Sequence, residues 1–295
     1  MRNYSSKLLL FGEHVLLLGS TALAMPVPAY SGKWVTTGAQ PDDVLQQKIF
    51  EFATSDQLRN ACALDIKAFQ KDLNRGLVFK STIPIGYGLG SSGALCAAVY
   101  NRYCRNKSDD LLELKNAFAT MESFFHGESS GIDPLTSYLK KPLIIRNRNN
   151  VTSASIPDWQ ESPIVFLIDS GLPRQTGHLV QWFMEKSKTE PLAAALQHQY
   201  LPSNEALVHH WLTANTEQFW HHLNLVSQFQ LDYFEPMVPA TMRTLWTENL
   251  QSGEITFKIC GAGGGGFLLG FSKTMAPVLA LSKRYNLIFP FSGKP

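Results

Sequence analysis

The chain alternates between short apolar runs, bounded by glycine and polar residues, and longer stretches with the periodicity of helices. The short runs predict strands at residues 5–11, 15–18, 31–36, 76–83, 142–146, 164–168, 254–260, 267–271 and 287–291. The longer stretches predict helices at residues 40–73, 94–103, 108–125, 177–188, 203–231, 235–250 and 274–285. We expect Ser108 to cap one of these helices and residues 146–155 to form a turn or hairpin.

The arrangement of these elements changes near residue 160, which predicts two lobes. Strands and helices mix before that point, whereas three helical stretches follow the buried strand at 164–168. We therefore expect an α+β protein with an N-terminal domain over residues 1–160 and a C-terminal domain over residues 161–295.

The composition excludes several classes of protein. With 44% hydrophobic and 17% charged residues the chain is an ordinary globular protein, and its net charge of +2 is too small for nucleic-acid binding. No apolar run reaches the ~18 residues of a membrane span, and Glu13 and His14 interrupt the run that imitates a secretory signal. The four cysteines lack zinc-ligand spacing, so we expect reduced thiols in a cytoplasmic protein. The sequence is compatible with a homodimer.

The loop at 85–93, Ile-Gly-Tyr-Gly-Leu-Gly-Ser-Ser-Gly, has the features of a phosphate-binding turn. It lies between a predicted strand and a predicted helix, and its glycines let the backbone approach a charged group closely. The start of the helix adds unpaired N–H groups and the positive end of the helix dipole. Ser91 and Ser92 add hydroxyls that could contact phosphate or a metal ion.

The same loop allows other interpretations. Gly88, Gly90 and Gly93 satisfy the dinucleotide-binding fingerprint G-x-G-x-x-G, and acidic residues follow at 109 and 110. That fingerprint normally follows a strand directly, whereas Pro84 and residues 85–87 intervene here. A glycine-rich turn with no ligand is a further alternative. The P-loop pattern is absent, because no lysine follows the glycines.

Three polar clusters could join this loop in one site, and each has a structural alternative. The turn Gly12-Glu13-His14 lies between apolar runs, as a surface turn would. Glu122 and His126 are spaced i,i+4 and share a helix face, as in a helical salt bridge. Asp133 begins another apolar segment, where it is either an N-cap or a carboxylate aimed into a cleft as a base.

Two more segments follow predicted strands. Arg174 and Thr176 come after the buried strand at 164–168, where they could contact an anionic ligand. The segment 261–266 has five glycines in six positions, and ordering it costs conformational entropy. This cost indicates that its backbone closely approaches another loop or a ligand.

The order of these motifs resembles the GHMP kinases, the superfamily of galactokinase, homoserine kinase, mevalonate kinase and phosphomevalonate kinase. The first motif is Lys7 with Gly12-Glu13-His14, the second is Pro84 with Gly88-Leu89-Gly90-Ser91-Ser92, and the third is the glycine segment 261–266. The resemblance extends from Lys7 to Phe271, and the fixed order of the three motifs makes it specific.

Within this superfamily the mevalonate kinases resemble the chain most. Residues 122–133 are similar to their pattern E-x-x-x-H-G-x-P-S-G-x-D, and residues 169–176 to their strand-end segment. The chain departs from the usual pattern at three places: Gly93 replaces alanine, Ser129 replaces proline, and residues 16–18 replace a Val-Val-aromatic run.

The resemblance implies a role for each matching residue. The residues that would wrap the phosphates of ATP are Gly88, Leu89, Gly90, Ser91 and Ser92. Ser92 and Glu122 would hold Mg²⁺, a hard cation that prefers oxygen ligands. Asp133 would accept the proton of the attacking hydroxyl, with Lys7 beside it. The residues that would orient the acceptor are Glu13, His14, Thr176 and Arg174, and those that would help close the cleft are Gly263, Gly264 and Gly265.

The resemblance also implies a fold and a reaction. The fold would have an N-terminal lobe like ribosomal protein S5 domain 2 and a ferredoxin-like C-terminal lobe. The reaction would be ATP-dependent phosphorylation of a small alcohol, mevalonate, to 5-phosphomevalonate. A GHMP kinase for phosphomevalonate or a sugar derivative is the nearest alternative. An NAD-binding oxidoreductase and a silent, ligand-sensing relative are more distant, and intact Lys7, Glu122 and Asp133 argue against silence.

Overall fold

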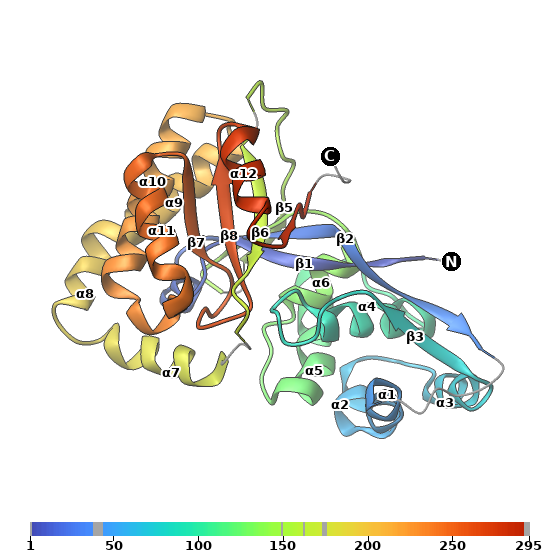
Figure 1. The fold of residues 1–295 in the computed structure, drawn as a ribbon. Coiled ribbons are helices and arrows are strands. Elements are labelled where there is room, and N and C mark those ends of the chain that lie inside the picture. The colour runs from blue at the N-terminus through green and yellow to red at the C-terminus, as the bar shows by residue number, and fades with distance from the viewer. Residues whose placement is uncertain (1, 38–43, 149, 162, 173–175, 292–295) are drawn as a thin grey trace.

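The computed structural model describes residues 2–37, 44–148, 150–161, 163–172 and 176–291, and its strands form two antiparallel sheets (Figure 1). The strands of the first sheet are β1 (Tyr4–Phe11), β2 (Ala22–Thr36), β3 (Leu77–Ser81), β4 (Leu143–Arg146) and β5 (Asn150–Ser153). Those of the second, in spatial order, are β7 (Ile255–Ile259), β8 (Phe267–Ser272), β6 (Ile164–Asp169) and β9 (Leu287–Ile288). Every pairing among the described strands is antiparallel. The alternative interpretation of the glycine loop as part of a dinucleotide-binding fold is therefore wrong, because that fold requires a parallel βαβ unit.

The long strand β2 organises the first sheet. Residues 22–24 pair with β4, residues 32–36 pair with β3, and β1 runs along much of the strand. The sequence predicts only residues 31–36 as a strand, whereas the observed strand begins at Ala22 and includes Pro26 and Pro28, which cannot donate ladder hydrogen bonds. The pairing with β1 jumps from Ser31 to Val27, so Pro28 falls in a bulge where no ladder bond is needed.

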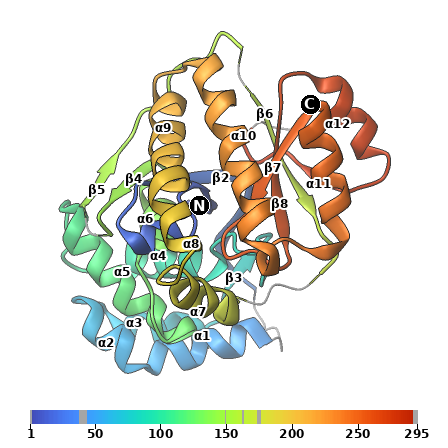
Figure 2. The same ribbon diagram turned by 90° about the vertical axis from the view of Figure 1, so that its left-hand side faces the viewer.

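The helices divide between the two sheets. Those in the first half of the chain are α1 (Val44–Thr54), α2 (Asp56–Ala61), α3 (Ile66–Asn74), α4 (Ser91–Tyr103), α5 (Leu111–His126) and α6 (Ile132–Leu139). Those in the second half are α7 (Thr176–Lys186), α8 (Leu192–Ala195), α9 (Leu201–Leu212), α10 (Thr216–Tyr233), α11 (Ala240–Ser252) and α12 (Met275–Ser282). Helix α4 packs on α5, α6 and β1, whereas α10 and α11 pack on β7 (Figure 2). Among the described helices, none combines the length and apolar character that a bilayer crossing requires.

Three local predictions are wrong, each because of a specific backbone feature. Residues 15–18 form a 3-10 turn rather than a strand, since His14 (φ 63°) and Gly19 (φ 90°) both adopt left-handed conformations that reverse the chain. Helix α5 is capped by Asp110, whose carboxylate accepts from two backbone N–H groups, and not by Ser108. The expected helix 203–231 breaks into α9 and α10, with left-handed Ala214 at the break.

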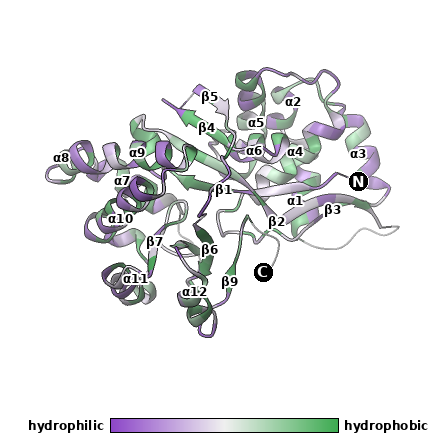
Figure 3. Ribbon diagram, turned by 90° about the horizontal axis from the view of Figure 1, so that it is seen from above, coloured by the Kyte–Doolittle hydropathy of each residue, from purple (hydrophilic) through white to green (hydrophobic). Residues whose placement is uncertain are grey.

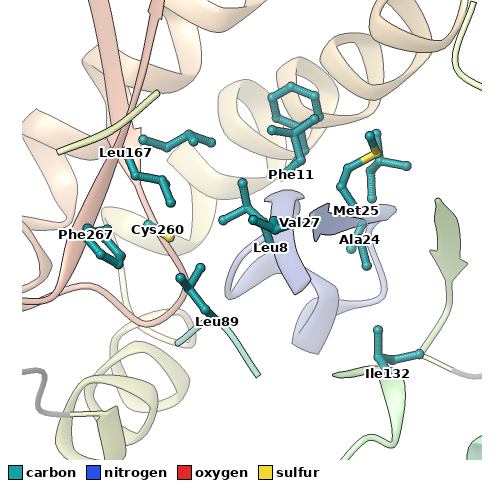
Figure 4. Packing of buried hydrophobic residues seen from close by; sticks show 14 of the residues in the cluster. Leu8, Phe11, Ala24, Met25, Val27, Leu89, Ile132, Leu167, Cys260 and Phe267 are labelled. Atoms are coloured by element: carbon teal, nitrogen blue, oxygen red, sulfur yellow. The ribbon is translucent and has the colours of Figure 1, made fainter. Parts of the chain in front are cut away.

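One continuous hydrophobic core joins the two sheets. Figure 4 shows Leu8 and Phe11 of β1 facing the same region as Leu167, Cys260 and Phe267 of the second half. Figure 3 shows β4 and β6 as mainly hydrophobic strands within this core. Because strands β1–β5 precede residue 160 and β6–β9 follow it, we propose the domains 1–160 and 161–295. The shared core fixes how the loops of both halves meet.

Candidate active site

The glycine loop ends directly on the start of α4. Gly88 (φ 76°) and Gly90 (φ 72°) adopt the left-handed conformation that glycine tolerates best, and Gly90 is the N-cap of the helix. The backbone N–H of Lys7 donates to the carbonyl of Leu89 at 3.0 Å, which ties the loop to β1. A Cβ at Gly90 would lie 3.0 Å from Lys7 Cγ and 3.3 Å from Asp133 Oδ2. The loop therefore covers a lysine–aspartate pair at close range.

That pair joins two elements that are far apart in the sequence. The ammonium of Lys7, on β1, lies 2.8 Å from Oδ1 of Asp133, in the first turn of α6. The side chains are 12% and 29% exposed, so the pair is partly enclosed yet accessible from one side. An ammonium and a carboxylate in this geometry can stabilise negative charge and accept a proton at the same place.

A second cluster surrounds the buried carboxylate of Glu122 on α5. Ser92 Oγ donates to Oε1 at 2.9 Å, and Ser129 Oγ donates to Oε2 at 2.6 Å. His126 Nε2 lies 2.9 Å from the same Ser92 oxygen. Burial, with a contribution from the charge of Asp133, raises the pKa of Glu122 to about 7, although both serine hydroxyls and Lys7 act in the opposite direction.

The donor set of this cluster fits Mg²⁺. Ser92 and Glu122 present two hard oxygen ligands, and the buried carboxylate is one whose ionised form an added cation would stabilise. Within the described part of the chain, no group of three or more His, Cys, Asp or Glu side chains could hold a metal ion. Two protein ligands with phosphates and water completing the shell is a usual arrangement for Mg²⁺.

The turn Gly12-Glu13-His14 contacts the second half of the molecule. The Glu13 carboxylate pairs with the ammonium of Lys258 on β7, and both side chains are only 1% exposed. Burial raises the pKa of Glu13, and the charge of Lys258 opposes this change. His14 Nε2 lies 3.1 Å from the carbonyl oxygen of Ala262, and its ring centroid lies 5.1 Å from that of Phe183.

The glycine segment 261–266 packs between the two halves. Gly264 N–H donates to the carbonyl of Met237 at 2.7 Å, and a Cβ at Gly263 would lie 2.6 Å from that same oxygen. On its other side, Gly266 faces Tyr87 of the glycine loop, whose ring centroid lies 4.7 Å from that of Phe267. The close backbone approach inferred from the glycines is therefore present, and its partners are protein loops.

Some contacts in the site were not predicted from the sequence, and one predicted site residue lies outside the described residues. Arg174 lies outside the described residues, and Thr176 is the first residue of α7. The sequence reading did not identify Ser129 as a partner of Glu122, nor Lys258 as the partner of Glu13. The sequence does contain an indication that Lys258 has a partner. This lysine lies inside the apolar run 255–260, and a buried lysine needs an opposite charge or a hydrogen-bond acceptor. The sequence singles out His126 for its helical spacing from Glu122 and for its place in the related pattern, but does not predict its contact with Ser92.

Comparisons with known proteins place the chain among related kinases by sequence similarity. Residues 57–141, which include the glycine loop, Glu122 and Asp133, match the family described as GHMP kinases N terminal domain. Over 279 residues the chain is 25% identical to the mevalonate kinase of Archaeoglobus fulgidus, covering 92% of each protein. These findings confirm the predicted GHMP kinase resemblance.

Solved structures share the fold over almost the whole chain. The mevalonate kinase of L. major in complex with R-mevalonate superposes with a TM-score of 0.68 at 16% identity, covering 99% of this chain and 97% of that one. The phosphomevalonate kinase of Streptococcus pneumoniae, in complex with phosphomevalonate and AMPPNP, gives 0.65 at 16% identity, covering 96% and 95%. The predicted two-lobed α+β GHMP kinase fold is confirmed.

Proposed function

We propose that this chain, a GHMP-type kinase that transfers a phosphoryl group to an alcohol, uses Mg-ATP as donor and mevalonate as acceptor. The observation that carries the proposal is the 2.8 Å contact between Lys7 and Asp133 beneath the glycine loop, next to the Ser92–Glu122 pair. The similarity to mevalonate kinase along 92% of the chain supports mevalonate as the acceptor.

In phosphoryl transfer, some of these residues position the reactants and others stabilise the charge that develops. Backbone N–H groups of residues 88–92, at the N-terminus of α4, bind the phosphates of ATP. Asp133 accepts the proton of the attacking hydroxyl, and the Lys7 ammonium stabilises the negative charge that develops beside it. Ser92 and Glu122 would hold Mg²⁺, which supplies positive charge to the phosphate oxygens.

The acceptor contacts come from both halves of the chain. We assign them to Glu13, His14, Arg174 and Thr176 on the basis of the family resemblance. Glu13 Oε2 is buried beside Lys258 and has no hydrogen-bond partner among the described residues, so it is an unsatisfied acceptor at this position. Glycines 263–265 would help to close the cleft, in a segment that contacts Met237 through Gly263 and Gly264 and the glycine loop through Gly266.

A second acceptor is supported by one comparison. The S. pneumoniae structure that contains phosphomevalonate superposes about as well as the one that contains R-mevalonate, so phosphomevalonate is the second candidate. Phosphomevalonate carries one more phosphate than mevalonate, so a site that binds it needs additional cationic groups.

An ADP-release assay across mevalonate, phosphomevalonate, galactose and homoserine, with Mg-ATP constant, tests the proposal. We expect turnover with mevalonate and a phosphorylated product detected by ³¹P NMR. Turnover only with another alcohol would show that the chain is a kinase but that mevalonate is not its acceptor. The absence of ADP release with all four, from protein that binds ATP, would point to the ligand-sensing alternative.

A further inference from the structure

We propose that Ser129 is a positioning residue that fixes the orientation of the metal-binding carboxylate of Glu122, an inference that rests on the proposed function. The two oxygens of this carboxylate have separate hydroxyl donors. Ser92 of α4 donates to Oε1 at 2.9 Å, and Ser129 of the α5–α6 loop donates to Oε2 at 2.6 Å. The second hydroxyl exists only because this chain has serine where the related pattern has proline.

The loop that carries Ser129 is packed closely against α5 at its Gly131 end. Gly127 (φ 77°) ends α5, and Gly131 (φ 73°) begins α6. A Cβ at Gly131 would lie 2.1 Å from the carbonyl oxygen of Lys115, so the loop backbone lies directly against α5. Ser129 therefore reaches Glu122 from a fixed position.

The same hydroxyl also contacts the helix that carries the proposed base. Ser129 Oγ accepts from the backbone N–H of Gly131 at 3.0 Å while it donates its own proton to Glu122. Gly131 is the N-cap of α6, and Asp133 is in the first turn of that helix. One oxygen atom thus links the proposed metal ligand to the element that positions the proton acceptor.

The physical consequence concerns the terminal torsion of the glutamate. Rotation about the bond to a carboxylate group is broad, so burial alone does not fix the plane in which the two equivalent oxygens lie. A short hydrogen bond to Oε2 holds that oxygen toward the loop and keeps Oε1 beside Ser92. Without it, the carboxylate gains orientations that do not place Oε1 with the Ser92 oxygen.

We expect Ser129→Ala to weaken metal binding by about 10- to 100-fold, the usual effect of removing a hydrogen-bond partner of a metal ligand. Ser129→Thr keeps the hydroxyl and should restore most of the affinity. Ser129→Val has the shape of threonine without its hydroxyl and should behave like the alanine variant. The matched control is Ser130→Ala, because among the described residues the only hydrogen bond of the exposed Ser130 Oγ is the one it accepts from the N–H of Ile132, at 3.3 Å.

The measurement is Mn²⁺ electron paramagnetic resonance, with Mn²⁺ titrated into protein saturated with AMPPNP, together with metal-free AMPPNP binding by calorimetry. Weaker Mn²⁺ binding in the alanine and valine variants only, with unchanged metal-free nucleotide binding, supports the inference. Wild-type Mn²⁺ affinity in a folded Ala or Val variant overturns it. If the wild-type protein itself binds no Mn²⁺ with the nucleotide, the proposed function fails instead.

Discussion

The ammonium of Lys7 lies 2.8 Å from Oδ1 of Asp133, and the backbone N–H of the same lysine donates to the carbonyl of Leu89. One residue of β1 therefore contacts both the proposed base and the proposed nucleotide loop. The distance between base and loop is set by the packing of α6 and α4 on β1, and not by either segment alone. The site is consequently sensitive to small changes in how these helices pack.

Removing the proposed base should abolish transfer and preserve nucleotide binding. We expect Asp133→Ala to lower kcat by about 10²- to 10⁴-fold or more, because a positioned base contributes that much. Mg-ATP affinity, measured by calorimetry, should stay close to that of the wild type. Asp109→Ala, at an exposed aspartate, is the control. Near-wild-type turnover in the Asp133 variant would remove Asp133 from the mechanism.

The stability of the metal-free protein should depend on pH through Glu122. Burial raises the pKa of this carboxyl from 4.5 to about 7, so the folded state binds the proton more tightly than the unfolded state does. The resulting stabilisation is complete below about pH 4.5 and is lost as the pH rises through about 7. The free energy of unfolding should fall by up to about 3 kcal/mol across this range.

Glu122→Gln provides the matched comparison for this pH dependence. The variant cannot ionise at residue 122, so its urea-unfolding free energy, measured between pH 4.5 and 8, should lack this decrease. Saturating Mg-ATP should also reduce the decrease in the wild type, because a bound cation favours the ionised carboxylate. An equal slope in both proteins would show that Glu122 does not titrate in this range.

Removing only one partner of the buried pair between Glu13 and Lys258 should lower the stability of the protein more than removing both. Lys258→Met leaves a buried carboxylate without its countercharge and should destabilise the protein by about 3–5 kcal/mol. Glu13→Gln combined with Lys258→Met should recover part of this loss, because the charge is then absent. Urea denaturation of the two single variants and the double variant measures the coupling, with Lys80→Met at an exposed lysine as control. Additive losses would show that the pair is not coupled.

Gly93 should not tolerate alanine, although alanine is usual in the related pattern. A Cβ there would lie 2.8 Å from the carbonyl carbon and the Cβ of Asp133 and from the nitrogen of Pro134, none of which can move independently of α6. We expect Gly93→Ala to shift α6, reduce kcat and cost about 1–3 kcal/mol of stability.

Gly253→Ala is a useful comparison for that variant. Gly253 has a left-handed φ of 71°, and a Cβ there would meet nothing within 4 Å, so only backbone strain is added. We expect lower stability with unchanged kcat, measured by thermal unfolding and steady-state kinetics. A wild-type kcat for Gly93→Ala would show that α4 and α6 can separate without disturbing the site.

Much of the site could be predicted because its motifs are local. Gly88 to Ser92 predict a phosphate-binding turn from glycine content and an adjacent helix start, whereas Asp133 is assigned by the family resemblance, since its place at a second helix start also fits an N-cap. The sequence predicts only the end of strand β2, and its earlier part contains prolines and a bulge that become visible only in the pairing with β1. Partners such as Ser129 for Glu122 depend on loop conformation, which local patterns do not encode.

The sequence by itself determined the family resemblance, the α+β composition and the candidate residues, because these depend on residue type, spacing and order along the chain. Only the tertiary structure decided which side chains meet. The contact of Lys7 with Asp133, the burial of Glu13 against Lys258 and the close approach of Gly93 to α6 all join segments far apart in sequence. Such contacts, and the electrostatic consequences of burial, arise from packing of the whole core and therefore have no signature in any single segment.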